Sequence, residues 1–218
     1  MGREELELLK GGVVKRKVKR RIGIFIDGLG LDRATRRVDK KVDLSRLVSG
    51  ITSGLQIEVA RYYTLVPYED DARQFAFLEA VERAGLEVIS KRLPPKGVKR
   101  QVSMDVHMAC DILSFAHGTF AEAQQKEETS KLAVNEDGIP DSSNAPKIHK
   151  AEFKNKSEIK RIAMVVCPSR ELSYAIYQAQ LTGVETSLAD FGLYGTSDGW
   201  RGVDRWIDLS TSETIWRE

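Results

Sequence analysis

The sequence is poor in several features that mark specialised classes of protein. Its 218 residues include only two cysteines, Cys110 and Cys167, and both lie in apolar runs, where a free thiol behaves as a small hydrophobic group. This excludes a disulfide scaffold and favours a reducing, cytoplasmic location. No run approaches the roughly 18 consecutive apolar residues that a membrane-spanning helix needs, so we expect no membrane partner.

The residue patterns of three common functional sites are also absent from the sequence. The histidines, His107, His117 and His149, do not have zinc-ligand spacing with the cysteines. Ser169 follows an apolar run but lacks the Gly-x-Ser-x-Gly pattern of a serine nucleophile. The Gly28–Gly30 segment is too short for a dinucleotide-binding loop. We therefore expect no structural zinc site, no serine-nucleophile site and no dinucleotide- or phosphate-binding loop.

The composition indicates one globular α/β domain with additions. Hydrophobic residues make up 41% and charged residues 30%, which allows a buried core beneath a well solvated surface. We expect a basic N-terminal arm over 1–21, a domain over 22–192 with a polar insertion at about 118–160, and a tryptophan-containing extension over 193–218. The formal net charge of +2 favours no particular partner.

Basic residues are concentrated at two places. Seven of them and no acidic residue lie between Lys10 and Arg21, and a second group follows Pro94-Pro95. Both groups are compatible with a solvated surface and with salt-dependent contact to phosphates. The candidate nucleic-acid-binding residues are Lys15, Arg16, Lys17, Lys96, Lys99 and Arg100.

Apolar patterning predicts strands and helices that alternate along the chain. Short β-branched runs are typical of parallel strands buried on both faces, and 3.6-residue spacing indicates helices. We expect Phe75, Leu78 and Val81 to be the buried face of one helix, and Val106, Ala109, Leu113 and Ala116 that of another. Strands are predicted at 22–26, 57–63, 86–90, 161–167 and 183–188, helices at 42–51, 70–84, 105–117 and 170–181, and an edge strand or hairpin at 206–209.

Four acidic residues fall where strand ends or helix starts are predicted. They are Asp27, Asp105, Asp111 and Glu171. In a parallel sheet such positions meet at the carboxyl edge, and converging carboxylates favour a hard ion such as Mg²⁺ or Mn²⁺. Simpler roles compete: Asp105 and Glu171 at helix N-termini, and Asp111 paired with His107. Asp27 is the hardest to explain without a ligand.

Four segments in order resemble the NYN domain, a family of the PIN-like nuclease superfamily that includes the LabA-like bacterial proteins. They are Ile22–Leu31, Val59–Tyr63, Phe77–Val88 and Met104–Leu113, and the resemblance extends over about 21–192. It implies a PIN-like Rossmannoid three-layer sandwich, with a central, mainly parallel sheet flanked by helices. It also implies Mg²⁺- or Mn²⁺-dependent cleavage of RNA by acidic residues at the carboxyl edge.

The family pattern assigns metal-ligand positions to Asp27, Asp105 and Asp111, but the chain departs from the pattern elsewhere. Gly30 replaces an expected Asn. The Ser-Gly-Asp-x-Asp-Phe signature aligns with 167–172, which puts Ser169 at one metal-binding aspartate and Glu171 at the other. Losing a carboxylate weakens the anchoring of the metal and the stabilisation of the transition state.

Two functions follow from the resemblance. One is a ribonuclease with a weakened site, in which Asp27, Asp105 and Glu171 are catalytic and the basic segments hold the phosphates. The other is an inactive pseudo-nuclease that binds nucleic acid, or that regulates a protein partner or forms a homodimer. RNA is the expected ligand both of the active ribonuclease and of the inactive nucleic-acid-binding form.

Overall fold

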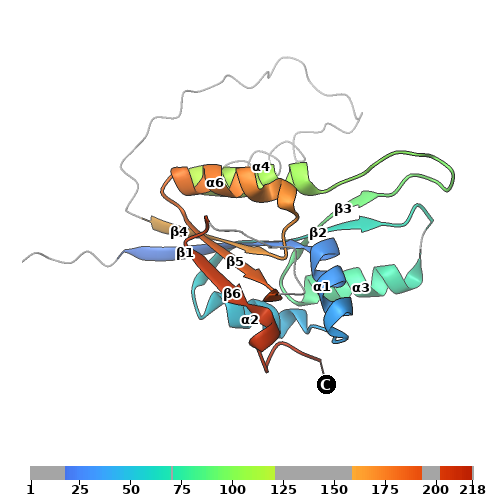
Figure 1. The fold of residues 1–218 in the computed structure, drawn as a ribbon, viewed down its shortest axis with the longest axis horizontal. Coiled ribbons are helices and arrows are strands. Elements are labelled where there is room, and N and C mark those ends of the chain that lie inside the picture. Colours follow the sequence, from blue (N-terminus) through green and yellow to red (C-terminus); the bar gives the residue numbers. More distant parts are fainter. Residues whose placement is uncertain (1–17, 70, 121–158, 193–201, 218) are drawn as a thin grey trace, which may run out of the picture.

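The computed structural model describes residues 18–69, 71–120, 159–192 and 202–217, in which helices and strands alternate (Figure 1). The N-terminal half contains β1 Lys19–Asp27, α1 Gly28–Val38, α2 Leu44–Thr52, β2 Gln56–Val66, α3 Ala72–Arg83, β3 Glu87–Arg92 and α4 Asp105–His117. The C-terminal half contains β4 Ile159–Val166, the 3₁₀ turn η1 Arg170–Leu172, α6 Ser173–Leu181, β5 Glu185–Asp190, β6 Arg205–Asp208 and the 3₁₀ turn η3 Leu209–Thr211.

The described strands form one six-stranded sheet in the order β3-β2-β1-β4-β5-β6, and every pair is parallel. This confirms the expected α/β class with a central parallel sheet. The segment around Trp206, for which an edge strand or a hairpin was predicted, is a parallel edge strand. The strand order reverses direction between β1 and β4, and open α/β sheets bind their ligands at the carboxyl ends of strands at such a switch point.

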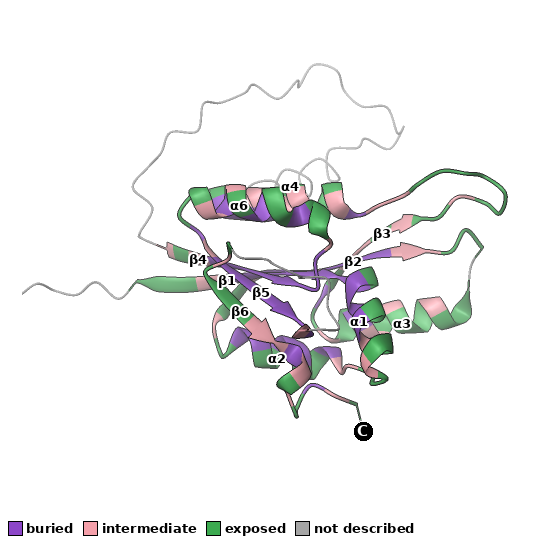
Figure 2. Cartoon of the chain, in the orientation of Figure 1, coloured by how far each residue is buried: buried purple, intermediate pink, exposed green. Residues whose placement is uncertain are grey.

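Helices cover both faces of the sheet, which gives three layers (Figure 1). One core cluster joins Ile24, Ile26 and Met164 of the sheet to α1, α2 and α3. The other joins Phe25 and Val165, whose side chains point the opposite way along the same strands, to α4 and α6. The central strands are buried on both faces (Figure 2), as their continuous apolar runs predict.

Two predicted helix faces were wrong in part. In α4, Val106 is 69% exposed, and the residues that face the sheet are Met108, Ile112, Phe115 and Ala116. This helix is apolar around most of its circumference, so periodicity alone could not select the face. In α3, Val81 is buried as expected, but Phe75 is 51% exposed.

Helix α1 was not predicted, and the chain after α1 adds an unexpected contact. Two glycines and the β-branched Thr35 and Val38 give α1 a weak local helical signal. Its stability comes from the Asp27 cap and from packing of Leu31 and Ala34 on the sheet. After α1, the main chain at 41–43 pairs with 215–217, through Asp43 N to Ile215 O and Arg217 N to Lys41 O, both 2.8 Å.

Among the described residues, no helix has both the length and the apolar character needed to cross a bilayer.

Candidate active site at the carboxyl edge of the sheet

Asp27 lies at the carboxyl end of β1, beside the switch point of the sheet. Its Oδ1 accepts hydrogen bonds from the backbone N–H groups of Leu29 and Gly30, each at 3.0 Å, so the side chain caps α1. The residue is only 7% exposed. Burial is the main cause that raises the pKa of Asp27, and the negative charge of Asp105 adds to it, while the bond from Gly30 opposes it. The ionised form of Asp27 is therefore less stable here than it would be in water.

Asp105 is the first residue of α4 and faces the same edge as Asp27. The N-cap position belongs to Met104, which makes no side-chain cap bond. Asp105 instead accepts hydrogen bonds from two serine hydroxyls: Ser103 Oγ bonds to Oδ2, and Ser169 Oγ bonds to Oδ1 at 2.7 Å. The structure thus brings Asp27, Asp105 and Ser169 together, from β1, α4 and the turn after β4.

Gly30, one departure from the NYN pattern, meets Cys167 at this edge, and Cys167 begins the turn that carries Ser169, the other departure. A Cβ atom added to Gly30 would lie 1.9 Å from the carbonyl oxygen of Cys167. Cys167 has a positive φ of 49°, which turns the chain after β4 toward α1. The missing side chain at residue 30 is therefore required by the path of the chain at residues 167–169. The two departures form one rearrangement.

Asp190 is a buried acidic residue of this edge that the sequence reasoning missed. It is fully buried at the carboxyl end of β5, and its Oδ1 accepts a 2.8 Å bond from Phe191 N. Burial first, and then the neighbouring Asp190 and Asp27 carboxylates, raise the pKa of the Cys167 thiol well above its usual range. Asp190 ends a buried strand, as Asp27 does, and this position was the available signal. It was missed because the strand was predicted to end at residue 188, whereas β5 extends to Asp190.

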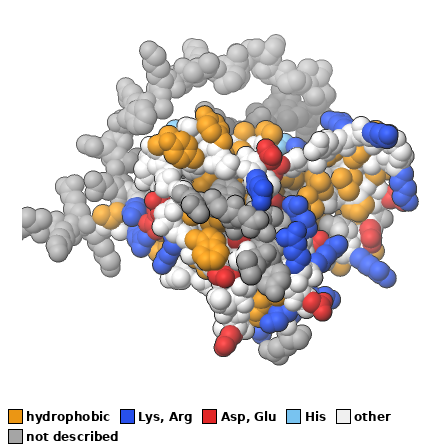
Figure 3. All heavy atoms as spheres, in the orientation of Figure 1, with side chains coloured by type: hydrophobic (Ala, Val, Ile, Leu, Met, Phe, Trp, Pro, Cys, Tyr) orange, Lys and Arg blue, Asp and Glu red, His pale blue; other side chains and the backbone are white. Residues whose placement is uncertain are grey.

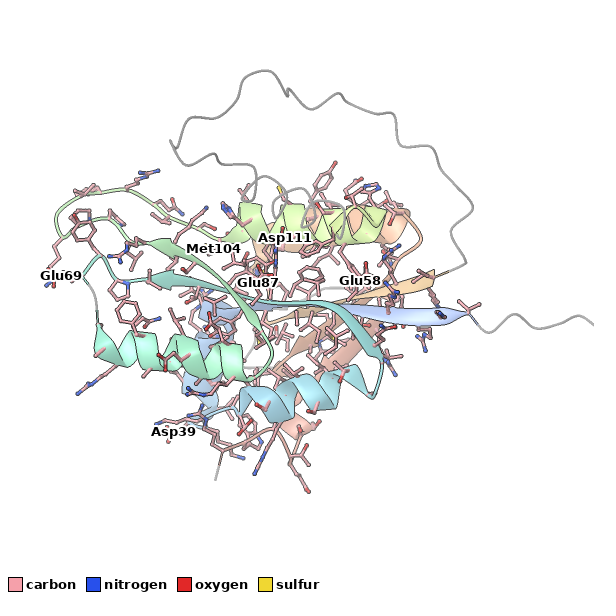
Figure 4. The ribbon with its side chains drawn as sticks, turned by 180° about the vertical axis from the view of Figure 1, so that it is seen from behind. Asp39, Glu58, Glu69, Glu87, Met104 and Asp111 are labelled. Atoms are coloured by element: carbon pink, nitrogen blue, oxygen red, sulfur yellow. The ribbon has the colours of Figure 1, made fainter. Side chains whose placement is uncertain are left out.

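Asp111 is held away from this group by a different set of partners. Its Oδ2 accepts hydrogen bonds from Arg61 Nη1 and Tyr63 Oη, both at 2.7 Å, and Arg61 also binds Glu87 at 2.8 Å. Figure 4 shows Asp111 and Glu87 close together between α4 and the sheet. The expected pairing of Asp111 with His107 was wrong. Arg61 already balances the Asp111 carboxylate, so a metal there would compete with a guanidinium.

The other candidate residues lie outside this hydrogen-bonded group. Glu171 is exposed in η1 and makes no hydrogen bond or ion pair with any residue the structure describes. The loop after β3 leads directly into α4, and it exposes Lys96, Lys99 and Arg100. Figure 3 shows Lys and Arg side chains gathered on that side of the molecule. The predicted Lys15, Arg16 and Lys17, and most of the polar insertion, lie outside the described residues.

The donor set fits a weakly held Mg²⁺ better than a tight metal centre. Within 18–69, 71–120, 159–192 and 202–217, no three His, Cys, Asp or Glu side chains converge as a metal-binding group. Of the acidic residues at this edge Asp190 is fully buried, which leaves the carboxylates of Asp27 and Asp105. Proteins hold Mg²⁺ with as few as one or two carboxylates when waters and substrate phosphates complete its shell. A hydroxyl at Ser169 adds an oxygen without adding the negative charge of an aspartate.

The fold and part of the sequence are similar to known proteins. The family model of the NYN domain matches residues 21–123. Among solved structures, the crystal structure of a protein of unknown function from Vibrio parahaemolyticus RIMD 2210633 is similar with a TM-score of 0.63 and 12% sequence identity, over 93% of this chain and 99% of that one. At this identity the likeness shows the fold alone. No curated protein matches the chain.

Proposed function

We propose that the protein binds single-stranded RNA and cleaves it weakly or not at all, because residues 21–123 match the NYN domain, a family of the PIN-like nuclease superfamily. The observation that carries this proposal is the bond from Ser169 Oγ to Asp105 at 2.7 Å. A neutral hydroxyl occupies the place where the family pattern has a metal-binding carboxylate.

The two remaining carboxylates supply a reason to keep a cation at this edge. Asp105 disfavours the anion of Asp27, and a divalent ion near both would relieve that repulsion. When bound, Mg²⁺ would provide positive charge for the phosphodiester and a coordinated water. Asp27 and Asp105 would hold the ion, and the hydrogen bond that Ser169 Oγ donates to Asp105 would orient the Asp105 carboxylate. With one carboxylate fewer, both the affinity for the ion and the rate of cleavage are expected to fall.

The proposed RNA path follows the loop between β3 and α4. Its exposed cations, Lys96, Lys99 and Arg100, lead to the first residue of α4, Asp105. The loop is anchored at this end because Lys91 Nζ donates a 2.9 Å bond to Ser103 O. Cations placed in this way would hold phosphates beside the carboxylates, and their contribution depends on salt.

Calorimetric titration with Mn²⁺ tests the metal site. We expect weak binding to the wild type, none to Asp27→Asn, and tighter binding to Ser169→Asp, which restores the carboxylate. Ser45→Asp, on the exposed side of α2, is the matched control, because it adds the same charge away from the site. Tighter binding to Ser45→Asp than to Ser169→Asp would contradict the assignment. RNA cleavage more than about tenfold faster in Ser169→Asp would support it, since this corresponds to about 1.4 kcal/mol.

Fluorescence anisotropy with single-stranded RNA tests the binding surface. For single strands, each phosphate contact contributes about 0.7 to the slope of log K against log salt. Replacing Lys96, Lys99 and Arg100 by Ala should therefore lower that slope by up to about 2. Replacement of Arg83, an exposed cation on α3 paired with Glu79, should leave it unchanged. No binding to the wild-type protein at low salt would refute the proposed function.

A second candidate function is a protein-interaction module, which the exposed apolar side of α6 favours. Tyr174, Tyr177 and Leu181 are 71%, 53% and 62% exposed, and they share one side of the helix. Light scattering over a concentration series would reveal a homodimer. Leu181→Ser should then shift the protein toward the monomer, and an unchanged monomer at every concentration would count against this candidate.

A further inference from the structure

A groove lies on the α1 side of the sheet, in the layer away from α4. It is an open groove of about 290 Å³ between α1, the segment that follows α1, and the C-terminal segment. Leu31 and the aromatic rings of Tyr62 and Phe77 form its apolar part, and Thr35, Lys41 and Arg217 are among its polar residues. The two rings meet edge to face, with their centroids 5.9 Å apart.

The cations of the groove are brought together by pairing of two distant chain segments. Arg217 N donates a 2.8 Å bond to Lys41 O, next to the bridge between Val42 and Trp216. The side chains of Lys41 and Arg217 are exposed, and neither makes an ion pair with any described residue. The acidic residue of the groove, Asp32, is bound at 2.9 Å by Arg36. The groove therefore has an excess of positive charge beside an apolar wall.

Tyr62 connects the groove to the carboxylate site. The residue is only 4% exposed, yet its hydroxyl makes no hydrogen bond to any residue that the structure describes. The same ring packs on Gly28, where a Cβ atom would lie 2.6 Å from it, and Gly28 follows Asp27 directly. The Tyr62 oxygen is not among the fully buried polar atoms that lack a hydrogen-bond partner, so the hydroxyl is open to solvent and can bond to a ligand that displaces water. Tyr62 is thus a hydrogen-bonding group available in the groove.

We infer that this groove binds one nucleotide of the RNA strand, with the base against Tyr62 and Phe77 and the phosphate held by Lys41 and Arg217. The inference rests on the proposed function and assigns a subsite to it. A planar ring with an anionic group satisfies the apolar wall, the paired cations and the Tyr62 hydroxyl together. The groove is at the lower end of ligand-pocket volumes, about 300 Å³, and so suits a single nucleotide.

The position of the groove along α1 suits a nucleotide near the one held at the carboxylates. Asp27 caps α1, and Leu31 and Thr35 of the groove lie on the same helix. With a rise of about 1.5 Å per residue, these residues are about 6 and 12 Å from Asp27 along the helix axis. The loop after β3 would contact the RNA backbone on one side of Asp27, and the groove would contact a base on the other. A base can enter the groove only when it is unpaired, so this arrangement favours single-stranded RNA.

NMR titration of the full chain with AMP, adenosine and inorganic phosphate, each in the presence of EDTA, tests the groove without the metal site. We expect AMP to bind more tightly than either fragment. Tyr62→Phe should weaken AMP about twofold to tenfold without lowering the Tm, because the hydroxyl has no protein partner to lose. Lys41→Ala and Arg217→Ala should each weaken AMP about threefold to tenfold. Arg205→Ala, an exposed cation at the start of β6, should change nothing.

Equal affinity for AMP and phosphate, or unchanged AMP affinity in all three groove variants, would overturn the nucleotide site. The same variants are then tested for binding to single-stranded RNA. Loss of affinity there supports the subsite, whereas wild-type RNA affinity with lost AMP affinity refutes its place on the RNA path. If AMP binds and RNA does not bind at low salt, the proposed function fails while the nucleotide site stands, so the two failures are distinguishable.

Discussion

Substitution of Gly30 by alanine tests the close approach between α1 and the turn after β4. The added Cβ would lie 1.9 Å from the Cys167 carbonyl oxygen, which belongs to the backbone and cannot rotate away. Either α1 or the turn must move by about 1 Å, and overpacking of this kind costs about 1–3 kcal/mol. We expect the upper part of that range, because the movement also strains the 3.0 Å bond from Gly30 N to Asp27. For a chain of this size the Tm should fall by about 5–10 °C.

Gly50 provides a matched control within the same protein. It lies on the exposed side of α2, and a Cβ atom added there would meet nothing within 4 Å. Gly50→Ala should therefore stabilise the protein by about 0.5–1 kcal/mol, because alanine favours the helix. Differential scanning calorimetry of both variants measures the two opposite shifts. A Gly30→Ala protein as stable as the wild type would refute the coupling between residue 30 and the turn after β4.

Three further variants test the electrostatics of the fold. Burial is the main cause that raises the pKa of Asp27, so the folded protein holds this proton more tightly than the unfolded chain does, and stability falls as the pH rises through the folded-state pKa. Asp27→Asn keeps an effective cap without the charge, so its Tm advantage over the wild type should be larger at pH 7 than at pH 4; equal differences at both pH values would contradict this. Asp111→Asn should lower the free energy of unfolding by about 1–3 kcal/mol in urea, because it removes the ion pair with half-buried Arg61. Glu87 also pairs with Arg61, but its side chain is 49% exposed, so Glu87→Gln should cost less than about 1 kcal/mol. Equal losses of stability in Asp111→Asn and Glu87→Gln would show that burial does not determine the strength of these ion pairs.

The fold class and the position of one carboxylate could be predicted from the amino-acid sequence alone. Continuous apolar runs such as Ile22–Ile26 are enough to identify strands buried on both faces, and those faces require helices on each side. Asp43, at the start of the helix predicted over 42–51, caps α2 by accepting the bond from Arg46 N at 3.0 Å. Asp27 comes directly after the apolar run Ile22–Ile26, so its place at the carboxyl edge could be predicted. These features depend on neighbours along the chain and on the alternation of burial.

Which side chains meet depends on how the elements pack in three dimensions. Ser169 and Asp105 are 64 residues apart in the sequence, and Asp111 and Arg61 are 50 apart. No local pattern indicates that one aspartate faces a serine hydroxyl and the other a guanidinium, because the sheet order and the face of α4 determine both pairs. The contact of Gly30 with the Cys167 carbonyl was hidden for the same reason. Local sequence determines what each segment becomes, and packing determines the partner, charge and solvation of each functional group.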